Sequence, residues 1–200
     1  MVDEAKTDID IKIVILGVSE VGKTCLLFKY FEDKFYESSL SSIGIDYKTK
    51  FFKFEGLKVR ANYVDTAGQE RFHGLSSNFL KYAHGVVFVY SIDSQQSLHK
   101  LTDWIEAIDR TKIAFIIVGN KCDLDDKQRK VKFEEGENFA KQYGSEFYEV
   151  SAKSGINVND VFDKIGFMTY EKVKANEHVN GEVLTKKKKK NKIDNLKCCN

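Results

Sequence analysis

The chain has 200 residues, of which 42% are hydrophobic, and a formal net charge of +2. This length and composition suit one α/β domain with a single core and leave no need for a second. The small net charge hides a basic end, because residues 176–200 carry seven lysines against three acidic residues and have a net charge of +4.

Several classes of protein are excluded by what the chain lacks. The first ten residues contain four acidic side chains and no apolar core of a secretory signal. No apolar run approaches the roughly 20 residues of a membrane-spanning helix. The four cysteines show neither a disulfide framework nor the spacing of a zinc site. We therefore expect a cytosolic protein in a reducing compartment.

Apolar runs typical of strands alternate with helical patterns along the chain. In order, we expect a strand at 9–17, a helix at 22–31, a polar connection at 33–42, strands at 44–55 and 57–65, a short helix near 75–81, a strand at 85–91, a helix at 94–109, a strand at 113–119, a helix at 133–143, a strand at 146–150 and a helix at 158–175. The turn Glu55-Gly56 predicts an antiparallel hairpin, and the helical crossovers predict parallel pairing elsewhere. The fold class is therefore α/β, with a six-stranded, mostly parallel sheet, one antiparallel strand and helices on both faces.

The stretch Gly17 to Thr24, between the first strand and the first helix, has the spacing G-x-x-x-x-G-K-[ST] of a phosphate-binding loop. Backbone N–H groups in such a turn point into one concavity at the positive end of the helix dipole, where a polyphosphate fits. Lys23 can reach the terminal phosphates, and the Thr24 hydroxyl can bind Mg²⁺. The other interpretation is an ordinary glycine-containing turn, and the loop alone does not choose between ATP and GTP or between an enzyme and a switch.

The stretch Asn120-Lys121-Cys122-Asp123 follows the strand at 113–119 and predicts the choice of base. The Asp123 carboxylate can accept hydrogen bonds from the N1–H and N2 amino groups of guanine, and adenine would leave it unpaired at a large energetic cost. The stem of Lys121 can cover the ring, and a backbone N–H of Ser151-Ala152-Lys153 can bind guanine O6. Alone, N-K-x-D also occurs in solvated turns, but together with the phosphate loop it predicts GTP or GDP. Because parallel strands end at one edge, we expect Gly17, Asp65, Asn120 and Ser151 to form one site.

Six motifs within residues 9–175 resemble one family. They are the phosphate loop, Ile43-Gly44-Ile45-Asp46, Asp65-Thr66-Ala67-Gly68-Gln69-Glu70-Arg71-Phe72, Ala83-His84-Gly85, Asn120-Lys121-Cys122-Asp123-Leu124 and Ser151-Ala152-Lys153. Together they resemble the Rab family of small GTPases, in the Ras superfamily. The resemblance implies a Ras-like GTPase domain at 9–175, between a leader at 1–8 and a flexible tail at 176–200.

The resemblance also implies roles for single residues. The phosphates would be bound by Ser19, Glu20, Val21, Gly22, Lys23, Thr24 and Cys25. Phe35 would pack edge-on against guanine. Ser42 would join Thr24 as a ligand of Mg²⁺, and Asp65 would hold the ion through water.

Hydrolysis would need little covalent chemistry from the protein. By the same resemblance, Gly68 would donate its N–H to the γ-phosphate and Gln69 would position the attacking water, while Lys23 neutralises developing charge. Turnover would be slow without an activating protein. The resemblance implies that the protein acts as a switch in vesicle traffic. It also implies further partners, namely an exchange factor, a GDP-dissociation inhibitor or escort, and effectors.

Three residues depart from the family pattern. Glu20 stands where glycine is usual, so we expect a strained backbone, repulsion from phosphates and faster nucleotide exchange; the alternative is that Glu20 points into water. Ser42 replaces threonine, which predicts a less firmly held loop. Val64 replaces a tryptophan beside the aromatic positions Tyr47 and Phe79, which predicts atypical effectors.

The tail combines a lysine run at Lys186 to Lys190 with two adjacent cysteines, Cys198 and Cys199. We expect it to be disordered from residue 176. The run alone would fit a solvated segment or a nuclear-localisation or nucleic-acid patch. The cysteines resemble the doubly geranylgeranylated ends of Rab proteins, so we expect a peripheral, lipid-anchored protein on the cytosolic face of an intracellular membrane, without a nucleic-acid partner.

Two further functions stay open from the sequence. The departures at Glu20, Ser42 and Val64 would also fit a guanine-nucleotide-binding scaffold with little hydrolysis. A phosphate-loop enzyme that uses ATP is disfavoured by Asp123. A monomer is the expected oligomeric state.

Overall fold

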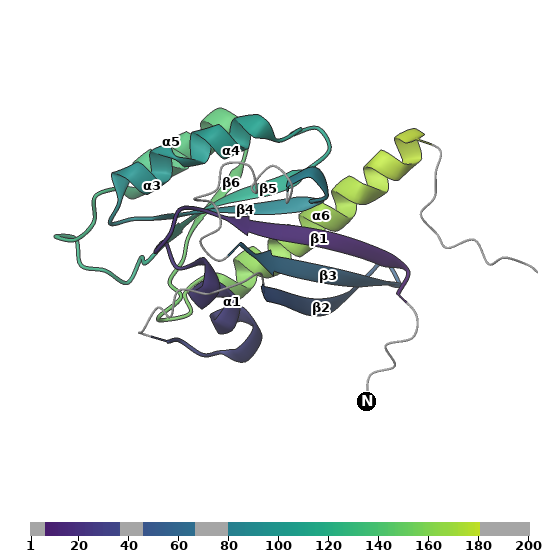
Figure 1. Cartoon of the computed structure of the whole chain (residues 1–200), viewed down its shortest axis with the longest axis horizontal. Coiled ribbons are helices and arrows are strands. Elements are labelled where there is room, and N and C mark those ends of the chain that lie inside the picture. The colour runs from purple at the N-terminus through teal and green to yellow at the C-terminus, as the bar shows by residue number, and fades with distance from the viewer. Residues whose placement is uncertain (1–6, 37–45, 67–79, 181–200) are drawn as a thin grey trace, which may run out of the picture.

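The computed structural model describes residues 7–36, 46–66 and 80–180 and has a six-stranded sheet (Figure 1). The strands are β1 (Ile9–Leu16), β2 (Asp46–Phe54), β3 (Leu57–Asp65), β4 (Gly85–Ser91), β5 (Ala114–Asn120) and β6 (Glu146–Glu149), in the order β2-β3-β1-β4-β5-β6. Only the pair β2 and β3 is antiparallel. The predicted fold class is confirmed.

Helices cover both faces of the sheet. They are α1 (Lys23–Glu32), α3 (Gln95–His99), α4 (Leu101–Ala107), α5 (Phe133–Tyr143) and α6 (Val158–Asn180). Side chains of α1 and α6 form one apolar cluster with the sheet, and side chains of α3, α4 and α5 form a second. Figure 1 shows α3, α4 and α5 together on one side and α1 on the other. Every residue of β4 and β5 is buried, as expected for parallel strands covered on both faces.

The hairpin between β2 and β3 turns through two residues with positive φ, Glu55 at 50° and Gly56 at 84°. Positive φ at both central residues is the requirement of a type I′ turn, whose twist matches that of paired strands. The Glu55 carboxylate then accepts a hydrogen bond from Tyr170 and forms an ion pair with Lys174. The tip of the hairpin is thereby fastened to α6.

Two expected boundaries are wrong. The single helix expected at 94–109 is two segments, α3 and α4, which are separated at Lys100, although the angles of Lys100 stay helical at φ −66° and ψ −18°. Helix α6 continues to Asn180 instead of ending near residue 175, so the expectation of disorder is wrong for residues 176–180. One physical reason is a hydrogen bond, because the Asn176 amide donates to Lys112 O at 3.1 Å.

Other expectations cannot be compared with the structure. The connection at 33–42 and the short helix near 75–81 lie mostly outside the described residues. None of the helices in the described part of the chain is long and apolar enough to cross a membrane.

Candidate nucleotide-binding site

The residues expected to form a site follow four strands that end at the same edge of the sheet. Gly17 follows β1, Asp65 ends β3, Asn120 ends β5 and Ser151 comes shortly after β6. The register pairs Ile15 with Asp65 and Ser91 with Asn120, which aligns these ends. The loops beyond this edge are joined by the side-chain contacts described below, so the predicted convergence is confirmed.

The phosphate loop depends on its two glycines. A Cβ on Gly17 would lie 2.1 Å from Val89 O, so only glycine lets the loop leave β1 so close to β4. Gly22 has φ 92° and caps α1, where it offers no side chain to the first N–H groups of the helix. Backbone N–H groups at the positive end of a helix dipole suit an anion.

Lys23 lies across the phosphate loop and is almost fully buried, with 5% of its surface exposed. Its ammonium donates hydrogen bonds to Gly17 O at 2.6 Å and to Val18 O at 3.0 Å. These carbonyls hold the charge beside the start of α1, where it adds to the positive end of the helix dipole.

Thr24 and Asp65 bring two oxygen atoms together from α1 and β3. The Thr24 hydroxyl donates to Asp65 Oδ2 at 2.5 Å, and Asp65 is 1% exposed. Mg²⁺ takes hard oxygen ligands and usually only one or two carboxylates, with phosphate and water filling the other positions. The two residues therefore fit a magnesium ion shared with a nucleotide. Within the described residues, no group of three or more His, Cys, Asp or Glu side chains could hold a metal by itself.

The Asn120 side chain joins the two ends of the site. Its amide nitrogen donates to Val21 O in the phosphate loop at 2.7 Å, and its amide oxygen accepts from Ala152 N at 3.1 Å. Asn120 is 1% exposed. This arrangement makes Asn120 a brace between the loops, a role that the sequence does not predict.

The Asp123 carboxylate is exposed and is oriented by Ser151. The Ser151 hydroxyl donates to Asp123 Oδ1 at 2.5 Å and accepts from Ser154 N at 3.0 Å. Cys122 N also donates to Val150 O at 3.0 Å. Asp123 and the loop after β6 therefore lie together, as a pocket for guanine requires.

The remaining predicted residues are placed as follows. Phe35 is partly buried against the cluster of α1 and α6, Ser19 is half-buried, Val21 is buried and Lys153 is exposed. Burial raises the pKa of the Cys25 thiol, with a further rise from Asp65, so this thiol stays protonated and is a poor nucleophile. Ser42, Gly68, Gln69, Phe79, Cys198 and Cys199 lie outside the described residues.

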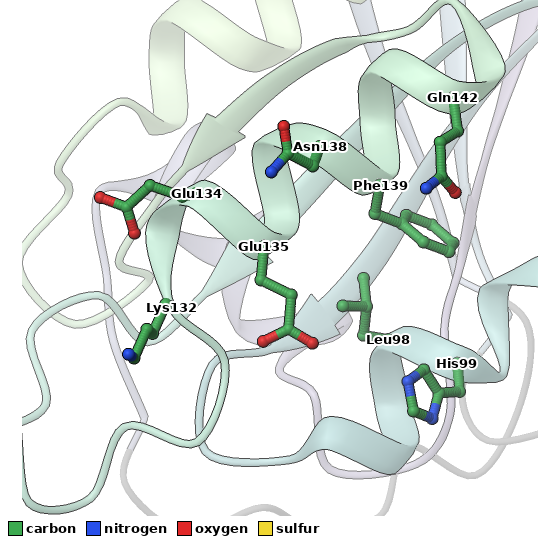
Figure 2. A pocket seen from close by; sticks show the side chains of 8 residues that line it. All are labelled: Leu98, His99, Lys132, Glu134, Glu135, Asn138, Phe139 and Gln142. Carbon is green, nitrogen blue, oxygen red and sulfur yellow. The ribbon is translucent and has the colours of Figure 1, made fainter.

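A concave feature with a volume of about 460 Å³ lies between α3 and α5. Figure 2 shows Leu98 and Phe139 between these helices, with His99 and Glu135 nearby. None of the predicted nucleotide-binding residues lines it. It is therefore distinct from the site at the edge of the sheet.

Comparisons with known proteins decide the family. The Ras family model matches residues 12–170. Rab-8B of Bos taurus is 42% identical over 162 residues, which cover 79% of this chain and 78% of the relative. Rab-8 of Diplobatis ommata is 40% identical over 190 residues, or 92% and 90% of the two chains. Rab-15 of Rattus norvegicus is 36% identical over 161 residues, which cover 79% of this chain and 76% of the relative.

The chain belongs to the Rab family of small GTPases. Its fold is the Ras-like GTPase domain, and it is a GTPase and a GTP-binding molecular switch of membrane traffic. The predicted family and enzyme class are confirmed.

Glu20 gives this Rab-family protein a strained phosphate loop. Its φ is 69°, the left-handed region that costs a residue with a Cβ about 1 kcal/mol or more. The unfavourable angle expected from the sequence is confirmed. The side chain is exposed, as the alternative of a solvated carboxylate expects, so strain and charge need separate tests.

We expect Glu20→Gly to slow GDP dissociation about fivefold, because relief of about 1 kcal/mol of strain favours the ordered loop that holds the nucleotide. Glu20→Gln keeps the strain and removes the charge, so it isolates repulsion between the carboxylate and the phosphates. Dissociation of a fluorescent GDP analogue measures both, with Glu106→Gln on the exposed side of α4 as control. Equal rates for the parent and Glu20→Gly would reject an effect of Glu20 on GDP retention.

Proposed function

We propose that this protein binds GTP and GDP together with Mg²⁺ at the edge of the sheet and hydrolyses GTP slowly unless a partner assists. The brace formed by Asn120 supports this proposal most directly, because it fixes the phosphate loop and the guanine-selecting loop at one site. In the proposed complex, Asp123 pairs with guanine, Lys121 and Phe35 flank the ring, and Ala152 N–H contacts O6.

The triphosphate would lie against the N–H groups of residues 19–25, with Lys23 on its terminal phosphates. Thr24, Ser42 and Asp65 would hold Mg²⁺, which supplies positive charge to the β- and γ-phosphate oxygens. Gln69 would orient the attacking water, and no side-chain nucleophile is needed. Arg129, for example, forms a bidentate ion pair with Glu149, at 2.5 and 2.8 Å, and is not directed to the phosphates. In the proposed mechanism an activating protein stabilises the charge that develops on the phosphate oxygens.

The two γ-phosphate-sensing residues would be Ser42, before β2, and Gly68, after β3. Ordering of both loops in the GTP state would change the surface beside the hairpin. There, Tyr47 is 56% exposed and pairs across the strands with the buried Val64. A small side chain at position 64 removes a large aromatic contact, so we propose an effector set that differs from that of typical relatives. Exchange factor, activating protein and GDP-dissociation inhibitor complete the proposed partners of a monomer.

We expect Asp123→Asn to weaken GDP binding at least about 100-fold, because an amide cannot accept hydrogen bonds from both the N1–H and the N2 amino group of guanine, and the unpaired polar groups cost several kcal/mol. Xanthosine diphosphate, which carries an oxygen in place of the guanine amino group, should bind the variant better than GDP does. Competition against a fluorescent GDP analogue measures this exchange of preference. Asp126→Asn, on the exposed loop nearby, is the control. An unchanged preference for GDP, or a parent that prefers ATP, would reject the guanine pocket.

We expect Gln69→Leu to reduce single-turnover GTP hydrolysis at least about tenfold, because leucine cannot orient water. GDP affinity should stay unchanged, since the proposed role of Gln69 is confined to the γ-phosphate. Measurement of released phosphate from pre-bound GTP tests the rate. A variant as fast as the parent would show that another residue positions the water.

The tail supports a proposal for membrane attachment. Two geranylgeranyl chains on Cys198 and Cys199 would anchor the protein stably, and each lysine of the run Lys186 to Lys190 would add about 1 kcal/mol near an anionic surface. Helix α6 is described as far as Asn180, and residues 181–197 of the sequence lie between that point and Cys198. We propose a peripheral position on the cytosolic face of an intracellular membrane.

We expect the double variant Cys198→Ser, Cys199→Ser to leave the membrane fraction of cells, because the lysine run alone binds weakly at physiological salt. Fractionation with the parent as reference measures the shift. A variant with the lysines 186–190 changed to glutamine should lose only part of its membrane association. Full retention of the double-cysteine variant on membranes would exclude lipidation as the anchor.

A further inference from the structure

One ion pair at the nucleotide edge has no part in the proposed chemistry. Asp93 lies two residues beyond the end of β4, and its carboxylate Oδ2 is 3.1 Å from the Lys121 ammonium. The two side chains are 34% and 33% exposed, so the contact is partly shielded from water. None of the sequence motifs contains Asp93, although an acidic residue just beyond a buried parallel strand is a signal for this edge.

Asp93 is held firmly on both sides. Its second oxygen, Oδ1, accepts a hydrogen bond from the Ser91 hydroxyl at 2.5 Å. The neighbouring Ile92 donates its N–H to Asn120 O at 3.1 Å and accepts from Val131 N at 2.9 Å. The loop that carries Asp93 is therefore tied to the end of β5, the strand that leads into Lys121. A carboxylate fixed in this way can act as an anchor for a flexible cation.

The charge of the Asp93 carboxylate agrees with its role as an anchor for the Lys121 ammonium. Burial opposes ionisation of Asp93, but the hydrogen bonds from Ser91 and Lys121 outweigh it, and the pKa of Asp93 is lowered. The carboxylate is therefore ionised at neutral pH.

The Lys121 backbone is also fixed, but its side chain needs an anchor. Lys121 has φ 71°, and its flanks are held by hydrogen bonds from Cys122 N to Val150 O and from Leu124 N to Lys121 O, both at 3.0 Å. The ammonium acts on the Cys25 thiol in the first turn of α1, whose pKa it lowers against the larger effect of burial. The side chain is held by the contact between its ammonium and the Asp93 carboxylate. Without this anchor the lysine stem would sample many rotamers and would not keep one orientation.

We propose that Asp93 is a positioning residue for guanine-nucleotide binding: its carboxylate anchors the Lys121 ammonium so that the lysine stem lies across the site of the base. This inference rests on the proposed function, because it assigns Asp93 to the same site. Asp93 does not touch the nucleotide and acts only through Lys121. Ser91 supports it by orienting the carboxylate.

The test is a double-mutant cycle in the full-length protein, with Asp93→Asn, Lys121→Met and both together. Dissociation of a fluorescent GDP analogue is measured for each. We expect Asp93→Asn to accelerate dissociation about two- to fivefold, the range of a partly exposed ion pair. In the Lys121→Met background the same change should have no further effect. Asp93→Glu should restore part of the loss, and Ser91→Ala should give a smaller acceleration.

Two measurements separate positioning from a general structural role. Hydrolysis of pre-bound GTP in a single turnover should be unchanged in Asp93→Asn, because Asp93 does not act on the phosphates. Asp103→Asn, an exposed aspartate on α4, should leave dissociation unchanged. An unchanged rate for Asp93→Asn, or equal acceleration with and without Lys121, would overturn the inference. A parent that does not prefer GDP to ADP would instead overturn the proposed function.

Discussion

The site depends first on the Asn120 amide, which is buried at the end of β5 and hydrogen-bonded to the backbones of two loops. One loop belongs to the start of α1 and the other follows β6, so the amide fixes the distance between the phosphate end and the base end. Gly22 must be a glycine partly for the same reason, since a Cβ there would lie 2.3 Å from the Asn120 amide nitrogen. Loss of one partner would leave buried polar groups unpaired, which is more costly than the bond itself is favourable.

Two non-glycine residues with a strained backbone lie at the same edge of the sheet. Glu20 and Lys121 both have positive φ although neither is glycine, and they lie in the phosphate loop and in the base-selecting loop. Such angles persist only where surrounding contacts determine them, and they are common at ligand sites. Here the contacts are the hydrogen bonds of Asn120, Asp93 and Val150. The rigid edge is suited to hold a ligand, and the loops that would sense its γ-phosphate leave from α1 and β3.

The far end of the molecule is held by polar contacts between the hairpin and α6. Lys50 on β2 contacts both Tyr30 of α1 and Asp163 of α6, at 2.7 and 2.8 Å. Glu55 at the tip contacts Tyr170 and Lys174. The hairpin that joins the two proposed sensing loops is thus attached to the helix that leads into the tail. Tyr30 also stacks on Phe162 with ring centroids 4.8 Å apart, which makes this junction apolar as well as charged.

The sequence by itself determined the strands, the phosphate loop and the choice of base, because these depend on local patterns: apolar runs, glycine spacing and an acidic residue after a strand. It also predicted which residues meet, since parallel strands end at one edge. Only the tertiary structure decided the length of α6, which a bond from Asn176 to a distant loop extends, and the break between α3 and α4. It likewise decided that Asn120 braces two loops, that Ser151 orients Asp123 and that Asp93 holds Lys121. These contacts join residues that are 28 to 99 positions apart in the sequence, and a local sequence pattern cannot predict contacts between residues so far apart.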